Sequence, residues 1–306
     1  MNPSAVDVKY APPARPPASV WPPKSAPSSL SVQSHGRSDP GVVRPSNEDQ
    51  FLIASLSKAL HVEGSSVEQP EVKFSDPLGT LFVVADGCGG HAGGEKASQL
   101  AVRSIEQSVV DTLNWCAQLR IGADGEALLG EFKKALSLAN ERLNHEADRH
   151  PQLHGMATTL TLAYFLRRDL FVAHVGDSRC YLLRKNLLYR LTRDHTMVAE
   201  MVRRGLIKPD DAAHHPYRHV VTNVVGGSDP GVDVEMHKLP LEAGDSILLC
   251  SDGLTEMVPD TDILNVLVTS QPDPAAACDR LTALANEKGG KDNVTVIVAR
   301  FDEQPS

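Results

Sequence analysis

The stretch Val83-Val84-Ala85-Asp86-Gly87 places an aspartate directly after an apolar run that is typical of a buried β-strand. Three other segments set an aspartate at one end of a similar run: Asn47-Glu48-Asp49 before residues 50–53, Leu248-Leu249-Cys250-Ser251-Asp252-Gly253, and Asp292-Asn293 before residues 294–298. Two of these aspartates follow their strand and two precede it. Because strand starts and strand ends alternate along one rim of an antiparallel sheet, we expect the four carboxylates to meet there.

Four carboxylates gathered in one place repel one another unless cations lie between them. Hard oxygen ligands suit Mg²⁺ or Mn²⁺, and four carboxylate charges balance two divalent ions. The pattern therefore predicts a two-metal hydrolytic site. Glycine after Asp86 and Asp252 would let the main chain approach an ion, because it has no Cβ. The alternative for these two Asp-Gly pairs is a pair of ordinary turns.

Arg44 lies five residues before Asp49. A planar guanidinium can hold two phosphate oxygens at once, which is the geometry that a phosphoryl substrate needs beside metal ions. We therefore expect Arg44 to bind substrate phosphate. The alternative is a surface salt bridge to Glu48 or Asp49.

The composition restricts the class of protein. A net charge of −9 argues against a nucleic-acid binder, and five cysteines without a Cys-x-x-Cys spacing argue against a disulfide framework or a zinc site. We see no apolar run near the ~18 residues that span a bilayer and no secretory signal. We expect a soluble, cytoplasmic monomer with neither a membrane nor a nucleic-acid partner.

The order of predicted elements favours an α+β fold. Strand-like segments lie at 50–55, 80–85, 158–165, 169–175, 179–184, 187–191, 232–238, 246–250 and 293–301, and helix-like segments at 94–114, 126–149, 196–206, 261–269 and 274–288. Thr196 and Thr261 are the expected starts of their helices. Strands in consecutive runs favour antiparallel pairing, so we expect two sheets packed face to face with helices outside.

Three segments stand apart from this pattern. Residues 1–30 are rich in proline, and we expect a disordered or polyproline-like tail, either passive or a dock for a proline-binding partner. The folded domain should span 31–306. Within it, residues 56–78 are predicted to be a long loop, and residues 196–230, here named the flap segment, a helical excursion beside the site.

The motifs together resemble the metal-dependent type-2C serine/threonine protein phosphatases in their compact prokaryotic form. The matching landmarks run from Asp39 to Asp292: Arg44-x-x-Asn47-Glu48-Asp49, Val84-Ala85-Asp86-Gly87-x-Gly89-Gly90-His91, Met156-Ala157-Thr158-Thr159-Leu160, His174-Val175-Gly176-Asp177-Ser178-Arg179, Leu191-Thr192-x-Asp194-His195, Ser251-Asp252-Gly253-Leu254 and Asp292-Asn293-Val294-Thr295. The set covers residues 34–302, and its specificity lies in the complete series and not in any single landmark.

This resemblance implies a four-layer α-β-β-α sandwich with two central antiparallel sheets and a two-metal centre at one end. The metal ligands it implies are Asp49, Asp86 as the bridge, the carbonyl of Gly87, Asp252 and Asp292, with Glu48 acting through water. Asp177 matches the residue that, with Asp252, holds a weaker third ion. The expected chemistry is hydrolysis of phosphoserine and phosphothreonine by in-line attack of a metal-bridging hydroxide, with Mn²⁺ or Mg²⁺ as cofactor.

One residue departs from the pattern of the animal relatives. Their proposed general acid, a histidine, is replaced by Cys88, which leaves His91 or a metal-bound water as the proton donor. Cys88 itself is either redox-sensitive or an inert buried thiol.

Two rival functions use the same fold: a catalytically silent binding module, and a two-metal hydrolase of a small phosphorylated metabolite. For the phosphatase, the expected partners are phosphoproteins, an opposing serine/threonine kinase, and the proline-binding partner of the tail.

Overall fold

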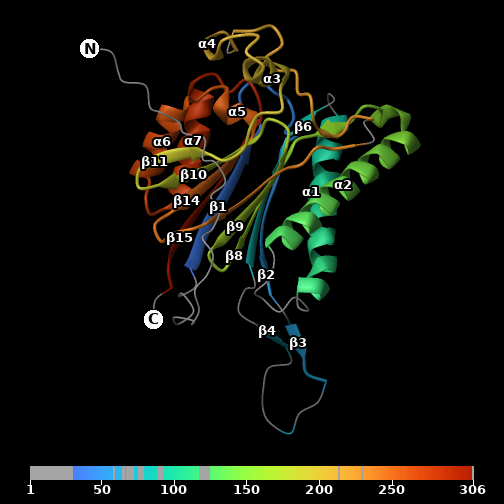
Figure 1. Cartoon of the computed structure of the whole chain (residues 1–306), viewed down its shortest axis with the longest axis vertical. Coiled ribbons are helices and arrows are strands. Elements are labelled where there is room, and N and C mark those ends of the chain that lie inside the picture. Colours follow the sequence, from blue (N-terminus) through green and yellow to red (C-terminus); the bar gives the residue numbers. More distant parts are fainter. Residues whose placement is uncertain are drawn as a thin grey trace.

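The computed structural model describes residues 30–57, 59–63, 66, 72–74, 79–88, 92–116, 125–212, 214–228 and 231–304 (Figure 1). The predicted tail therefore lies outside the described residues, apart from Leu30. The same holds for Gly89, Gly90 and His91 and for most of the loop predicted at 56–78.

Two five-stranded sheets form the centre of the fold, and every neighbouring pair within them is antiparallel. The first sheet has the order β1 (Leu30–Asp39), β15 (Val294–Glu303), β14 (Ser246–Cys250), β10 (Arg179–Arg184) and β11 (Leu187–Arg190). The second has the order β13 (Glu235–Pro240), β9 (Asp169–Val175), β8 (Leu160–Leu166), β5 (Gly79–Ala85) and β2 (Gln50–Leu56). The predicted antiparallel pairing is confirmed.

Helices cover the outer face of each sheet, as Figure 1 shows. The long helices α1 (Ala92–Cys116) and α2 (Gly125–Arg149) pack on the second sheet, with a short 3₁₀ turn at Pro151–Leu153. On the first sheet pack α5 (Asp252–Thr255), α6 (Asp260–Thr269) and α7 (Pro274–Glu287). A third apolar cluster fills the space between the sheets. The arrangement confirms the predicted four-layer α-β-β-α sandwich.

Strand β5 shows why its sequence is an uninterrupted apolar run. Successive side chains of a strand point to opposite faces. Leu81 and Val83 pack under the helices, whereas Phe82 and Val84 pack between the sheets. Both faces of the strand are therefore buried, and each large apolar side chain contributes about 1.5–3 kcal/mol of transfer free energy. The packing fixes β5, and with it the position of Asp86.

Several predicted boundaries were wrong. Strand β1 was not predicted, because it is an edge strand whose polar side chains reach solvent on one face. The run predicted at 158–165 divides at Thr159 into β7 (Ala157–Thr158) and β8, since the Thr159 N–H donates to the carbonyl of Asp86 (2.9 Å). Helix α6 begins at Asp260, so Thr261 is not its start. The loop predicted at 56–78 contains a two-stranded ribbon, β3 (Ala59–His61) with β4 (Val72–Phe74).

The flap segment contains α3 (Met197–Arg203) and α4 (Pro209–Ala212) and rejoins the body at β12 (Val225–Gly226). Thr196 is the N-cap of α3, as predicted, because its side chain accepts a hydrogen bond from the Ala199 N–H (3.3 Å). Strand β12 pairs with β7, which in turn pairs with β6 (Gly87–Cys88). In Figure 1, α3 and α4 lie at the same end of the sandwich as α5 and β6.

None of the helices in the described ranges combines the length and apolar character needed to cross a bilayer.

Candidate metal centre

The strand register brings the predicted aspartates to one end of the sandwich. Gln50 pairs with Ala85, so Asp49, which precedes β2, and Asp86, which follows β5, lie at the same end of the second sheet. Cys250 pairs with Val296, so Asp252 and Asp292 lie at one end of the first sheet. These two ends coincide, since the hydroxyl of Ser251, which follows β14, donates to Oδ2 of Asp49 (2.7 Å). The charges of the four aspartates consequently act on one another.

Asp49 is the most deeply buried member of the cluster, with 2% of its surface exposed. The hydroxyl of Ser251 donates to its Oδ2 (2.7 Å), whereas its Oδ1 is buried without a hydrogen-bond partner among the described residues. The pKa of Asp49 is raised to about 6, mainly by burial, with the hydrogen bond from Ser251 acting against the rise and the charge of Asp292 adding to it. A buried, unpaired carboxylate oxygen is an acceptor that a cation would satisfy.

The carboxylates of Asp86 and Asp252 are likewise destabilised in their charged form, by burial and by neighbouring negative charges. Burial is the main cause that raises the pKa of Asp86, and the charges of Asp49 and Asp252 add to it. Burial likewise raises the pKa of Asp252, followed by the charge of Asp177. Mutual repulsion of this kind among half-buried carboxylates is relieved by divalent cations. The donor set of carboxylate oxygens fits Mg²⁺ or Mn²⁺.

The main chain around Gly87 leaves no room for a side chain. A Cβ built on Gly87 would lie 2.2 Å from the carbonyl oxygen of Gly94 and 2.8 Å from that of Glu48. Gly94, in the first turn of α1, is equally restricted, since its Cβ would lie 2.0 Å from Oε2 of Glu48. Glu48, Gly87 and the start of α1 therefore pack together beside Asp86.

Arg44 contacts Asp292, and the structure contains neither of the alternative salt bridges to Glu48 or Asp49 among its described ion pairs. Nη2 of Arg44 lies 2.6 Å from Oδ2 of Asp292, and 52% of the Arg44 side chain is exposed. The loop before it is held down because the N–H groups of Val42 and Val43 both donate to the carbonyl of Gly290 (2.8 and 3.2 Å). Arg44 thus presents a guanidinium at the rim of the carboxylate cluster.

Asp177 follows strand β9 and lies near Asp252. Burial, followed by the charge of Asp194, raises the pKa of Asp177 to about 6. The charge of Asp177 in turn contributes to the raised pKa of Asp252. The preceding residue, Gly176, has a φ of +111°, a conformation that favours glycine. The structure therefore places Asp177 at the edge of the cluster.

Cys88 lies two residues after Asp86, and its side chain is half-buried. Burial, followed by the charge of Asp177, raises the pKa of its thiol to about 12. A thiol with so high a pKa is protonated and unreactive at neutral pH. The structure thus favours the inert thiol over the redox-sensitive one.

Four polar residues that belong to the quoted motifs, but to which the sequence analysis assigned no role, hold the ligands in place. Thr158 donates its hydroxyl to the carbonyl of Asp86 (2.8 Å), and Thr159 accepts from the Asp86 N–H (3.0 Å). Asn293 accepts from the Glu48 N–H (2.8 Å), and Ser251 binds Asp49 as described above. Their position in the sequence could have identified them, because each is a polar residue at the end of an apolar strand and lies within a motif or next to a predicted ligand.

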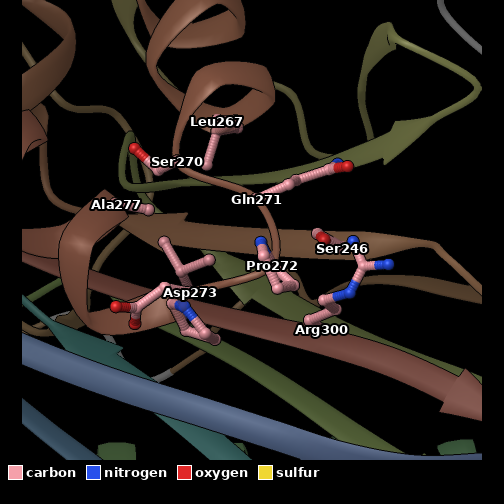
Figure 2. A pocket seen from close by; sticks show the side chains of 10 residues that line it. Ser246, Leu267, Ser270, Gln271, Pro272, Asp273, Ala277 and Arg300 are labelled. Carbon is pink, nitrogen blue, oxygen red and sulfur yellow. The ribbon is translucent and has the colours of Figure 1, made fainter.

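A small cavity between β14, β15 and the start of α7 is not a second candidate (Figure 2). It is lined by Ser246, Pro272 and Arg300, among others, and its volume is about 10 Å³. That space is sufficient for a single water molecule and too small for a ligand.

Comparison with known proteins points to one family. The family model for "Protein phosphatase 2C" matches residues 61–291. The serine/threonine phosphatase Stp of Listeria welshimeri is 34% identical over 262 residues, which cover 86% of this chain and 93% of that protein. The crystal structure of the Mycobacterium tuberculosis phosphatase PstP/Ppp aligns with a TM-score of 0.71 at 34% identity and covers 89% of this chain and 99% of that one. The catalytic domain of PstP, solved with two manganese ions, aligns with a TM-score of 0.68, also at 34% identity and with the same coverage of 89% and 99%.

Proposed function

We infer the activity of this protein from the premise that the chain belongs to the protein phosphatase 2C family. It is a metal-dependent serine/threonine protein phosphatase, and its substrates are phosphoproteins. The resemblance noted in the sequence and the predicted fold are thereby confirmed.

The finer proposal concerns the residues that hold the ions. Asp49, Asp86, the carbonyl of Gly87, Asp252 and Asp292 are proposed to bind two divalent ions, with Glu48 acting through water. The observation that carries this proposal is the carboxylate cluster, half-buried except for the fully buried Asp49, whose Oδ1 has no partner among the described residues. When bound, the ions supply Lewis acidity at the phosphoryl group and allow water to act as a nucleophile at neutral pH.

A third, weaker site is proposed at Asp177 together with Asp252. It is supported by the charge of Asp177, which is the largest contribution after burial to the raised pKa of Asp252. Mn²⁺ and Mg²⁺ both fit such an oxygen-only donor set. A structure of the relative PstP with two manganese ions supports Mn²⁺ as the first ion to test.

Binding and orientation of the phosphoryl group are assigned to Arg44. The Arg44 guanidinium would bind two non-bridging phosphate oxygens and orient the phosphoryl group over the cluster. Cys88 is not a suitable proton donor, because a thiol with a pKa of about 12 is a very weak acid, and it is not a suitable nucleophile, because hardly any thiolate is present at neutral pH.

Turnover of a phosphothreonine peptide with Mn²⁺, measured beside calorimetric Mn²⁺ binding, tests the function and the site together. The wild-type protein should bind two Mn²⁺ ions and release phosphate, and Asp86→Ala or Asp252→Ala should lower turnover by at least about 10³-fold. If metal-loaded protein with native circular dichroism shows no turnover, the silent binding module is favoured. If a small phosphorylated metabolite is hydrolysed and the peptide is not, the metabolite hydrolase is favoured.

The remaining assignments concern partners and location. An opposing serine/threonine kinase, a proline-binding partner for residues 1–30, a monomeric state and a cytoplasmic location are proposed from the sequence. The described cysteines Cys88, Cys180, Cys250 and Cys278 are free thiols, which suits a reducing compartment. Cell fractionation and size-exclusion chromatography would test the location and the oligomeric state.

A further inference from the structure

His195 lies where both ends of the flap segment meet the body of the protein. Its N–H donates to the carbonyl of Gly176 (2.7 Å), and its own carbonyl accepts from the N–H (2.8 Å) and the hydroxyl (3.0 Å) of Thr222. Its side-chain Nδ1 accepts from the Gly176 N–H (3.1 Å) and from Nδ2 of Asn223 (2.9 Å). One residue therefore connects the turn before Asp177, the start of the flap segment and the segment's return.

The bonding partners fix the tautomer of His195. A main-chain N–H and an amide NH₂ can only donate, so Nδ1 carries a lone pair and the ring proton lies on Nε2. Nε2 faces Oε2 of Glu235 at 3.4 Å. The amide of Asn223 is itself oriented, because its Nδ2 donates to the carbonyl of Asp233 (2.6 Å) and its Oδ1 accepts from the Asp233 N–H (3.2 Å). Every polar atom of the ring thus has an assigned partner.

His195 also belongs to a cluster with His174 and Glu235 whose ligand atoms lie within 4.8 Å of one another. A metal is not the best explanation of this cluster. Nε2 of His174 must carry a proton, since it lies 3.0 Å from the carbonyl oxygens of both Gly176 and Arg193. Its Nδ1 bonds with the hydroxyl of Thr161 (2.8 Å). Hydrogen bonds therefore occupy the lone pairs that a cation would need.

Apolar packing does little to hold α3 and α4, the helical part of the flap segment. Val198 is the buried residue of α3, and α4 has none. Beside α3 lies a groove of about 1050 Å³ lined mainly by residues with charged or polar side chains, Arg193, Glu200 and Asp233 among them. A segment with few buried apolar contacts is positioned by its hydrogen bonds. The bonds at its base therefore determine where it stands.

The contact with Gly176 leads from His195 to the metal centre. A Cβ on Gly176 would lie 2.6 Å from the Thr159 side chain, and the hydroxyl of Thr159 in turn accepts from the Asp86 N–H (3.0 Å). Gly176 also precedes Asp177 directly. Its packing against Thr159 fixes the Gly176–Asp177 turn to the metal centre, so this turn is the rigid reference against which His195 holds the flap segment.

We propose that His195 is a positioning residue that fixes the flap segment relative to the Gly176–Asp177 turn, through the two hydrogen bonds accepted by its Nδ1. The proposal rests on the phosphatase function and adds a determinant of polypeptide-substrate binding. A polypeptide extends beyond the phosphoryl group and can reach the flap segment, whereas a small aryl phosphate cannot. The flap segment does contact the metal end of the fold, since Nδ1 of His219 lies 2.7 Å from Oε1 of Glu256, which follows α5.

Three substitutions separate this role from general stabilisation. Asn places its side-chain oxygen near the position of Nδ1, so His195→Asn keeps the acceptor. His195→Gln and His195→Ala remove it. With a phosphothreonine peptide at saturating Mn²⁺, we expect KM to rise about ten-fold for His195→Gln and His195→Ala and less than three-fold for His195→Asn. The KM for p-nitrophenyl phosphate should change by less than three-fold in all three variants.

His237→Asn is the matched control. His237 donates to the same Glu235 (2.7 Å) from two residues further along β13, and among the described residues it makes no hydrogen bond or ion pair with the flap segment. It should leave both KM values unchanged. Hydrogen exchange gives a second measurement: amides of residues 197–212 should exchange faster in His195→Ala than in the wild type or in His237→Asn.

Two results would overturn the role of His195 while leaving the phosphatase function intact. One is a peptide KM that does not distinguish His195→Asn from His195→Ala. The other is a parallel loss with both substrates and no change in exchange over residues 197–212. If His195→Ala does not fold, Asn223→Ala removes one of the two donors and should raise the peptide KM in the same direction. A wild-type protein without Mn²⁺-dependent turnover would instead contradict the proposed function.

Discussion

Nη2 of Arg44 lies 2.6 Å from Oδ2 of Asp292, although 248 positions separate the two residues in the chain. The contact joins the loop after β1 to an aspartate two residues before the last strand, β15. It holds the guanidinium proposed to bind phosphate against an aspartate proposed to bind metal. The substrate-binding and metal-binding functions therefore share one edge of the sandwich.

Removing the guanidinium should weaken phosphate binding more than it slows the chemical step. A charge-assisted hydrogen bond contributes about 1.5–3 kcal/mol, so we expect Arg44→Ala to raise the KM for a phosphothreonine peptide by about 10–100-fold. Arg44→Lys keeps the charge without the two-pronged geometry and should recover only part of the loss. Steady-state kinetics at saturating Mn²⁺ measures both variants. A fall in kcat at constant KM would contradict this role.

Neutralising Asp49 should stabilise the metal-free protein at neutral pH. The pKa of this carboxyl rises on folding from 3.8 to about 6, mainly through burial, so the folded state favours the protonated form. The metal-free protein thus loses stability as pH rises from about 4 to about 6, and the full loss of about 3 kcal/mol is present above pH 6.

After EDTA treatment, we therefore expect Asp49→Asn to melt roughly 5–10 °C above the wild type at pH 7.5 and at the same temperature as the wild type at pH 4. Differential scanning calorimetry across this range measures the difference. Added Mn²⁺ should reverse the order at pH 7.5, since the wild type keeps its ligand. Equal melting temperatures at every pH would show that the ionised Asp49 carboxylate does not destabilise the metal-free protein.

A methyl group at Gly87 should disturb the metal centre directly. Its Cβ would lie 2.2 Å from one main-chain oxygen and 2.8 Å from another, and neither can move without shifting α1 or Glu48. We expect Gly87→Ala to lose more than ten-fold in turnover and about 1–3 kcal/mol of unfolding free energy. Gly130→Ala is the control, because a Cβ there meets nothing within 4 Å. Within helix α2 that change should stabilise the protein by about 0.5–1 kcal/mol.

The Cys88 thiol should react slowly with alkylating reagents, although it lies beside the metal centre. With a pKa of about 12 caused mainly by burial, only about one thiol in 10⁴ is ionised at pH 8. We expect iodoacetamide to label Cys88 of the metal-free folded protein far more slowly than in urea, as read by peptide mass spectrometry. Cys88→Ser should retain turnover within about three-fold. Rapid labelling with loss of activity would instead support a redox-sensitive thiol.

Much of the fold could be predicted because its signals are local. The apolar runs that became β5, β9, β14 and β15 are buried on both faces, and burial on both faces is what makes a run continuous. Strand β1 was missed for the converse reason, since its side chains alternate between solvent and the interior. The start of α6 was misplaced by one residue because Pro259, and not a capping threonine, precedes it.

The sandwich, the family and the aspartates at the strand ends could be predicted from the amino-acid sequence, since strand periodicity and the order of motifs are properties of neighbouring residues. Three relationships became apparent only in the folded protein: Arg44 meets Asp292, Oδ1 of Asp49 is buried without a partner in the described part of the chain, and His195 joins both ends of the flap segment. These relationships depend on how strands and loops distant in the chain are brought together. No local spacing encodes that placement, because the distances are set by the packing of two sheets whose strands come from opposite ends of the chain.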